Sequence, residues 1–451
     1  MSVRMSGKHV ENGPIVPVLI SFALPVLLLQ LLQELFNVTD CMVVGHFGGD
    51  YALAATGVAG LVLSILINFF VGFSSGISGI ASRLFGERDY RELKRTVNVL
   101  FRLAVAAGIG LSALVIAAAD SVLLLIRCPA EVAPHAALYL RICACGLTAQ
   151  MIYNVGAAFL RSIGNTHAPL VFYLASVLCN LVLDALLVIV FKRGIAGAAA
   201  ATLASQWLLA ILIAGYMTRL ESAFALDPLG EGLPMRELGK ALSIGIPSGM
   251  QALFMSISSF LIQASINRFG PDAIAGMTLF AKLEGVIYLP TFAYGIAITS
   301  FVGQLLGARM IDRICEVVRL SLGINAAVIV PLSLALSLAS PLLLRLFTAD
   351  EAILFNAREA VMFTLPFYVV YGLNQVFLGT IKGLGNTAWP MICTLVCYSL
   401  FRVLWCRLLI PVLHTMRVVY SSYVVSFFLM LLMLVPAYKR RMRMISADGA
   451  R

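Results

Sequence analysis

Apolar segments about twenty residues long recur along the whole chain, and they limit what it can fold into. A helix needs roughly twenty apolar residues to cross the ~30 Å hydrocarbon core of a bilayer. Apolar residues make up 61% of this chain and charged residues only 12%, unlike a soluble domain. The sequence therefore predicts an all-α polytopic membrane protein with twelve transmembrane helices. The twelve windows lie near residues 17–44, 52–75, 97–119, 135–160, 168–191, 195–217, 241–268, 273–302, 317–340, 355–379, 388–411 and 417–437.

A longer polar connection separates the first six windows from the last six. We therefore expect an N-terminal six-helix lobe at residues 1–217 and a cytoplasmic inter-lobe linker at 218–239. A C-terminal six-helix lobe should follow at 240–438, and a basic cytoplasmic tail at 439–451. An even number of spans returns the chain to the side on which it began, so both termini should lie on the same side of the membrane.

The two sets of six windows are related in sequence. The segment "RSIGNTHAP" at 161–169 matches "KGLGNTAWP" at 382–390 with a shift of 221 residues. The same shift, within one residue, aligns Pro25 with Pro247 and Gly86 with Gly307. Because each half has six helices, the two copies enter the membrane in the same direction, and a pseudo-twofold axis should run along the membrane normal. A cleft between the lobes is then the expected substrate path.

Basic residues in the loops predict the orientation, since cytoplasmic loops retain lysine and arginine. The chain has 32 such residues. Eight lie in loops or at helix ends that we assign to the outside: Arg127, Lys192, Arg193, Arg268, Arg345, Arg358, Arg407 and Arg417. Four others, Arg102, Arg141, Lys282 and Arg402, lie deeper within apolar windows. The remaining twenty are on the side of the termini, which we therefore expect in the cytoplasm of a prokaryote, with the protein in the inner membrane. Topology and attraction of the tail "KRRMR" to anionic lipid explain the net charge of +10, without nucleic-acid binding.

The stretch "CNLVLD" at residues 179–184 places Asn180 and Asp184 inside the fifth window. A carboxylate within hydrocarbon costs at least ~2.5 kcal/mol on the mildest insertion scale, so such a residue usually has a function. The two side chains are four residues apart and share one face of the expected helix. They could contribute to an ion site, or they could only bond neighbouring helices, as intramembrane polar residues often do.

Four segments taken in order resemble the multidrug and toxic compound extrusion (MATE) family across essentially the whole chain. They are "NVTDCMVVGHFGG" at the end of the first helix, "SGIASRLFGERD" after the second, the basic-x-x-Gly-Asn-Thr loop of both halves, and "NLVLD" in the fifth helix. The resemblance implies a V-shaped secondary active exporter of amphipathic, often cationic compounds. Such an exporter would alternate between inward-open and outward-open states. The major facilitator fold also has two parallel halves of six helices, but its loop signature is absent after the second helix.

The resemblance also implies a coupling site for Na⁺ or H⁺ in the N-terminal lobe, at Asp40, Asn180, Asp184 and Thr202. Helical rise supports this assignment, because Asp40, Asp184 and Thr202 lie roughly 6–12 Å from the expected outer boundary at ~1.5 Å per residue, and Asn180 lies one turn deeper. Two carboxylates, an amide oxygen and a hydroxyl are hard ligands of the kind that Na⁺ accepts, and the carboxylates could instead share a proton. Some branches of the family carry acids in the second lobe, but this chain has Tyr371 at the tenth-helix position, which favours coupling through the first lobe.

Seven residues are candidates for the substrate cavity, although helix packing explains each of them equally well. Glu34 and Glu284 lie near mid-depth, where they could pair with a cationic substrate. Glu284 could instead form a buried ion pair with Lys282, Arg102, Arg141 or Arg402. The full set is Gln33, Glu34, Asn37, Tyr139, Met151, Asn154 and Glu284.

Other function classes fit the sequence less well. A lipid-linked saccharide or metabolite flippase of the same superfamily is the alternative, but a cluster of cavity arginines for a pyrophosphate is missing. An intramembrane enzyme would need a nucleophile or a metal set, and no HExxH or GxSxG motif is present. We therefore expect a monomeric transporter, not an enzyme, with no cofactor beyond Na⁺ or H⁺ as the coupling ion. Its partners should be small amphipathic molecules and membrane lipid.

Overall fold

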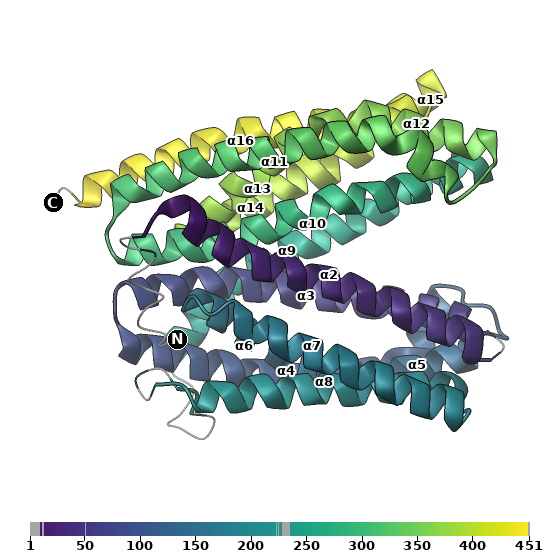
Figure 1. Ribbon diagram of the computed structural model, residues 1–451, viewed down its shortest axis with the longest axis horizontal. Coiled ribbons are helices and arrows are strands. Elements are labelled where there is room, and N and C mark those ends of the chain that lie inside the picture. The colour runs from purple at the N-terminus through teal and green to yellow at the C-terminus, as the bar shows by residue number, and fades with distance from the viewer. Residues whose placement is uncertain are drawn as a thin grey trace.

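The computed structural model describes residue 10 and residues 13–49, 51–221, 223, 225–227 and 235–449, and this part of the chain is helical throughout, without strands (Figure 1). The first half contains α2 (Ile15–Phe47), α3 (Ala52–Gly86), α4 (Tyr90–Leu125), α5 (Ala133–Ala144), α6 (Leu147–Ser162), α7 (His167–Asp184), the π-helix η1 (Ala185–Val190) and α8 (Gly194–Thr218). The second half contains α9 (Met235–Ile266), η2 (Asn267–Phe269), α10 (Pro271–Gly307), α11 (Ile311–Arg345), α12 (Glu351–Thr364), η3 (Leu365–Phe367), α13 (Tyr368–Gly383), α14 (Ala388–Cys393), the π-helix η4 (Thr394–Phe401), α15 (Arg402–Leu413) and α16 (Arg417–Gly449).

The predicted number of spans agrees with these helices. Eleven continuous helical stretches of the described residues are long and apolar enough to cross a membrane. A twelfth span arises when α5 and α6 are counted as one helix bent by 44°. The prediction of an all-α membrane protein with twelve transmembrane helices in two sets of six is confirmed.

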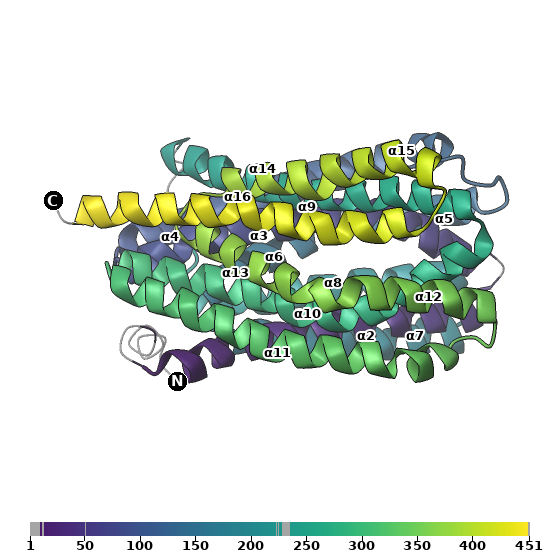
Figure 2. The ribbon, with the colours of Figure 1, turned by 90° about the horizontal axis from the view of Figure 1, so that it is seen from above.

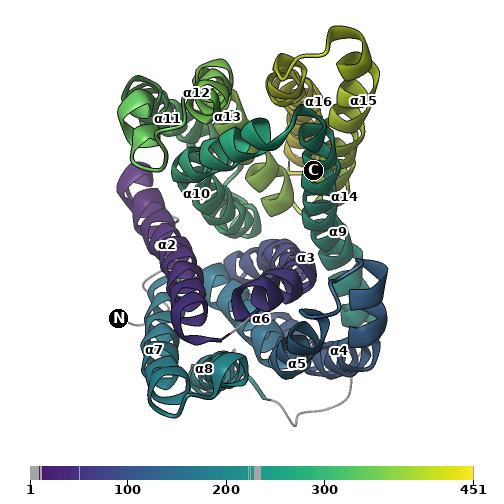
Figure 3. The ribbon, with the colours of Figure 1, turned by 90° about the vertical axis from the view of Figure 1, so that its right-hand side faces the viewer.

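The helices form two lobes, with α2–α8 in one and α9–α16 in the other (Figures 1 and 3). Helix α2 contacts both. Near its start, Phe22 packs edge-on against Phe301 of α10, with ring centroids 5.9 Å apart. Beyond Pro25, α2 packs against α7 of its own lobe. Helix α2 begins and α16 ends at the same end of the molecule, and α16 extends past its neighbours there (Figure 2).

The backbone repeats the internal symmetry of the sequence. Positive φ angles recur with the shift of 221, at Gly49 (89°) and Gly270 (90°) and again at Gly164 (87°) and Gly385 (83°). The shift also relates one pair of non-glycine residues: Arg88 has φ 60° and its counterpart Arg309 has φ 58°. Equivalent turns therefore connect equivalent helices in the two lobes.

The Gly-Asn-Thr motif has a structural explanation in both lobes. The Asn165 side-chain oxygen accepts a hydrogen bond from the backbone nitrogen of Ala168, at 3.1 Å, near the start of α7. Asn386 accepts an equivalent bond from Trp389 at 3.1 Å, near the start of α14. Each glycine supplies the left-handed turn and each asparagine satisfies an otherwise unpaired N–H of the next helix.

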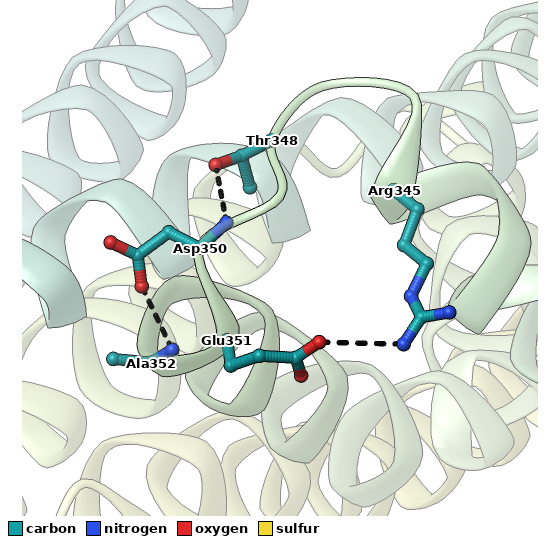
Figure 4. Close-up of polar contacts among 5 residues, drawn as sticks. All are labelled: Arg345, Thr348, Asp350, Glu351 and Ala352. Carbon is teal, nitrogen blue, oxygen red and sulfur yellow. Dashed lines mark hydrogen bonds and ion pairs between the residues drawn. The ribbon is translucent and has the colours of Figure 1, made fainter.

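A capped turn joins α11 to α12 at the end of the molecule opposite the start of α2 (Figure 4). Asp350 is the N-cap of α12 and accepts a hydrogen bond from the nitrogen of Ala352 at 2.9 Å. The Asp350 nitrogen donates to the Thr348 hydroxyl at 3.1 Å, and Arg345 pairs with Glu351 at 3.4 Å. These contacts fix the residue at which α12 begins. The helix then continues to Thr364, where η3 interrupts it.

Helix α3 contacts both α9 and α10 of the other lobe, and we call the place where it meets α10 the α3–α10 crossing. A Cβ atom at Gly86 would overlap the carbonyl oxygen of Gln304, and a Cβ atom at Gly307 would overlap that of Arg83. These contacts are a symmetric pair, because Gly307 is the counterpart of Gly86 and Gln304 that of Arg83. The Gln304 side-chain nitrogen also donates to the carbonyl oxygen of Ser162 in α6, at 2.6 Å. Only glycine allows the two helix backbones to approach this closely.

Candidate functional site

The end of α2 and the start of α8 are set side by side by a glycine contact. A Cβ atom at Gly194 would lie 2.8 Å from the carbonyl oxygen of Gly48, just beyond the end of α2. Asp40 is eight residues before Gly48, and Thr202 is eight residues after Gly194. Since the helices run in opposite directions, Asp40 and Thr202 lie at similar depth, about 12 Å from this contact.

The register of α7 against α8 follows from one hydrogen bond. The Ser176 hydroxyl donates to the carbonyl oxygen of Ser205 at 2.8 Å. One turn toward the α7–α8 loop, this antiparallel register places Asn180 beside Thr202. Asp184 lies one further turn toward the loop. The four predicted residues therefore occupy two adjacent levels of the N-terminal lobe, and Thr202 shares the level of Asn180 rather than that of Asp184.

The side chains at these positions are buried and largely without hydrogen bonds. Asp184 is 1% exposed, Asn180 3% and Thr202 7%. Both carboxylate oxygens of Asp184, Oδ1 of Asp40, the Thr202 hydroxyl and the Asn180 side-chain nitrogen have no protein hydrogen-bond partner. A buried polar group without a partner costs about 1–3 kcal/mol, so this cluster is expensive unless something binds to it. We call these four residues the N-lobe cluster.

The carboxylates of the N-lobe cluster are close enough for their charges to interact. Asp40 and Asp184 act on each other electrostatically, and both act on the Tyr139 hydroxyl from α5. Tyr139 is 7% exposed. Among the described residues, no three His, Cys, Asp or Glu side chains gather as a metal site. Two carboxylates, an amide and a hydroxyl instead fit a hard monovalent cation or a shared proton.

A change of helix type marks the position of Asp184. It is the last α-helical residue of α7, and the π-helix η1 follows directly at Ala185–Val190. A π-helical turn inserts an extra residue, shifts the side-chain register and occurs frequently at functional sites. The apolar sequence of η1 gives no signal for this change.

The predicted substrate-cavity residues do not form one group. On α2, Glu34 and Asn37 are exposed and Gln33 is half-buried. In α6, the Asn154 side-chain nitrogen is buried without a partner, whereas Met151 lines an apolar pocket among α3, α4, α6 and α9. Of the seven, Tyr139 is the one with a recorded electrostatic interaction with the N-lobe cluster.

Glu284 belongs to a separate polar network in the C-terminal lobe. Its carboxylate accepts a hydrogen bond from the hydroxyl of Tyr368, the first residue of α13. Arg402 donates to Ser426 at 2.7 Å and lies over the rings of Tyr398 and Tyr423, 4.6 and 4.3 Å from their centroids.

The other cations proposed as ion-pair partners of Glu284 have contacts of their own. Arg141 pairs with Asp120 at 2.6 Å, and Arg102 donates to the carbonyl oxygen of Asp227 at 3.4 Å. Lys282 is exposed. The nearest observed partner of Glu284 is therefore a tyrosine and not a cation.

Sequence reasoning missed one polar residue beside the cluster. Gln206 lies one turn beyond Thr202 on α8, and its side-chain oxygen is buried without a partner. A Cβ atom at Gly146, in the break between α5 and α6, would overlap that oxygen. The spacing of four residues between Thr202 and Gln206 was a usable signal, because it places both on one helix face.

Comparisons with known proteins agree on the family. The sequence model of the MatE family matches residues 25–186 and again residues 247–408, which independently reproduces the repeat. The chain is 25% identical to "Probable multidrug resistance protein YoeA" of Bacillus subtilis over 82% of each chain. It is 28% identical to "Probable multidrug resistance protein NorM" of Aromatoleum aromaticum, over 83% of this chain and 82% of that one.

A solved structure gives the same fold. It is described as the "outward-facing conformation of a multidrug resistance MATE family transporter of the MOP superfamily", and it superimposes with a TM-score of 0.87 at 20% identity. The match covers 98% of this chain and 99% of that one. This multi-pass membrane protein with bacterial relatives therefore belongs to the MATE family of transporters.

Proposed function

We propose that the chain is a multidrug exporter that couples efflux of amphipathic, often cationic compounds to entry of Na⁺ or H⁺. Relatives that span more than four-fifths of the chain have names of multidrug resistance proteins, which supports this substrate class. The observation that carries the coupling is the N-lobe cluster, in which both oxygens of the buried Asp184 and Oδ1 of the half-buried Asp40 lack protein partners. A bound Na⁺ or proton would satisfy those oxygens and remove the cost of burying them.

We further propose that both termini are cytoplasmic and that the structure is closed at its cytoplasmic end. The excess of loop cations at the end that carries the termini supports this orientation. The α3–α10 crossing then closes the cytoplasmic end. In the inward-open state this crossing would have to separate, since two lobes rocking about a fixed site expose one end at a time.

The coupling residues would be Asp40, Asn180, Asp184 and Thr202 in the N-terminal lobe. Asp40 is on α2, which also packs against α10 of the other lobe, so a cation bound at Asp40 could favour one arrangement of the lobes. A ligand shifts a conformational equilibrium only through its different affinity for the two states. The site therefore has to bind its cation more tightly in one state than in the other.

The test is efflux by the purified protein in liposomes under separately imposed Na⁺ and H⁺ gradients. A fluorescent lipophilic cation serves as the transported probe. Accumulation against its own gradient under at least one ion gradient supports the proposal. Equal rates with and without both ion gradients would exclude coupled export.

A further inference from the structure

Gln206 lies one helical turn further along α8 than Thr202, and so at a different depth from the N-lobe cluster. On α8, Gln206 lies four residues beyond Thr202, and the α7–α8 register places Asp184 one turn to the other side of Thr202. At ~1.5 Å per residue, Asp184 and Gln206 are about 12 Å apart in depth, too far for one cation to touch both. Asn180, Thr202 and Asp40 occupy the level between them.

The polar groups of α7 and α8 thus form a short path that leads inward from the carboxylates. Asp184 is at the outer level, Asn180 and Thr202 are one turn further in, and Gln206 is another turn further in. Each of these four side chains has at least one buried polar atom without a protein partner. Helix α8 adjoins both α7 and α5 in the N-terminal lobe (Figure 3), so these levels share one lobe interior.

The surroundings of Gln206 favour its use as an oxygen ligand. Its amide oxygen points at Gly146, between the end of α5 and the start of α6, where the helix bends by 44°. Any side chain larger than hydrogen at residue 146 would displace that oxygen. Packing therefore fixes the direction of Gln206 without supplying a hydrogen-bond donor for its oxygen.

We propose that Gln206 is an inner station for the coupling cation, where the cation rests after it leaves Asp40 and Asp184 on its way to the cytoplasm. The shared chemistry is a cation carried with water, either Na⁺ held by the amide oxygen or a protonated water that donates to it. The inference rests on the proposed coupled export. It adds that the cation leaves through the interior of the N-terminal lobe and not through the cleft between the lobes.

If Gln206 is an inner station, its loss should slow transport of the cation but leave the equilibrium affinity for the cation almost unchanged. Gln206→Leu removes the oxygen, so cation movement inward should slow about tenfold or more, the effect of losing one bond to a charged group. Equilibrium affinity for the cation, measured from the Na⁺ or pH dependence of the melting temperature, should stay within about twofold of the parent, since the outer carboxylates remain. Gln206→Glu keeps an oxygen at this position and should transport faster than Gln206→Leu.

The experiment compares these variants in liposomes under a Na⁺ gradient and, separately, under a pH gradient. Slowing under the Na⁺ gradient identifies Na⁺ at the station, and slowing under the pH gradient identifies protonated water. Gln263→Leu is the matched control, because Gln263 is exposed on α9 and donates to Asn267, four residues on at the start of η2.

Two results would overturn the inner station. The first is a Gln206→Leu protein that transports at the parental rate under both gradients, and the second is a loss of equilibrium affinity as large as the loss of rate. Asp184→Asn separates this failure from failure of the proposed function. If Asp184→Asn abolishes coupling while Gln206→Leu is normal, only the inner station is wrong. If Asp184→Asn is normal, the coupled-export proposal itself is wrong.

Discussion

Ser78 of α3 and Ser300 of α10 share a buried hydrogen bond of 2.8 Å that joins the two lobes. The residues belong to equivalent helices, and their bond lies beside the α3–α10 crossing. Because the bond links lobes that must separate during alternating access, it should exist in only one of the two states. Because the two hydroxyls are this close, a cross-link between residues 78 and 300 can test whether the lobes separate there.

A disulfide at this position should stop transport. We expect Ser78→Cys with Ser300→Cys, in a protein whose nine native cysteines are replaced, to lose nearly all efflux after oxidation. A reducing agent should restore it, because only the covalent link prevents the crossing from opening. The single Ser78→Cys variant is the control. Undiminished efflux by the cross-linked protein would show that the crossing does not open.

A large side chain at the crossing should prevent its closure. Gly307→Leu places a branched side chain against the Arg83 carbonyl, and such overpacking costs about 1–3 kcal/mol in the closed state. A cysteine at Ser300 should then react faster with a membrane-impermeant thiol reagent added to inside-out vesicles. Gly110→Leu on α4, where a Cβ atom has no neighbour within 4 Å, is the control. Unchanged labelling in Gly307→Leu would argue against a gate at this place.

Capping by the two Gly-Asn-Thr loops should contribute measurably to stability. Asn165→Ala and Asn386→Ala each remove a side-chain acceptor near a helix start, and each should lower the free energy of unfolding by about 1 kcal/mol. Because the two sites are in different lobes, the effects should add in the double variant. Thermal denaturation in detergent measures this. A double variant as stable as the parent would mean that water caps these helices equally well.

Substitutions at Glu284 and Tyr368 distinguish a role of Glu284 in substrate recognition from a role in structural support. If Glu284 contacts cationic substrates, Glu284→Gln should lower the efflux of cations and spare neutral compounds, because only the charge changes. Tyr368→Phe removes the hydrogen-bond donor but keeps the carboxylate, so it should spare both classes. Efflux of a matched cationic and neutral pair of dyes measures the selectivity. Equal loss of both classes, with a lower melting temperature, would assign Glu284 to the structural bond with Tyr368.

Residues whose role depends on chain direction and spacing could be predicted from the sequence. The repeat, the membrane spans and the common depth of Asp40 and Thr202 all follow from counting residues along helices. Contacts between helices could not be predicted, because spacing along one helix does not tell which neighbour it meets. The bond between Gln304 and Ser162 and the overlap of Gly146 with Gln206 depend on such packing. The sequence also did not predict the π-helix after Asp184, because its apolar residues fit an α-helix equally well.

Ion-gradient-driven transport by purified Asp184→Asn in liposomes tests whether Asp40 and Asp184 couple ion entry to efflux, with drug binding measured on the same preparation. Asp120→Asn is the control, because Asp120 is an exposed carboxylate of the same lobe, paired with Arg141. We expect Asp184→Asn to fold and bind drug but no longer to concentrate it, while Asp120→Asn does both. Normal coupled transport by Asp184→Asn would contradict coupling through these carboxylates and leave Asp184 as a helix-packing residue.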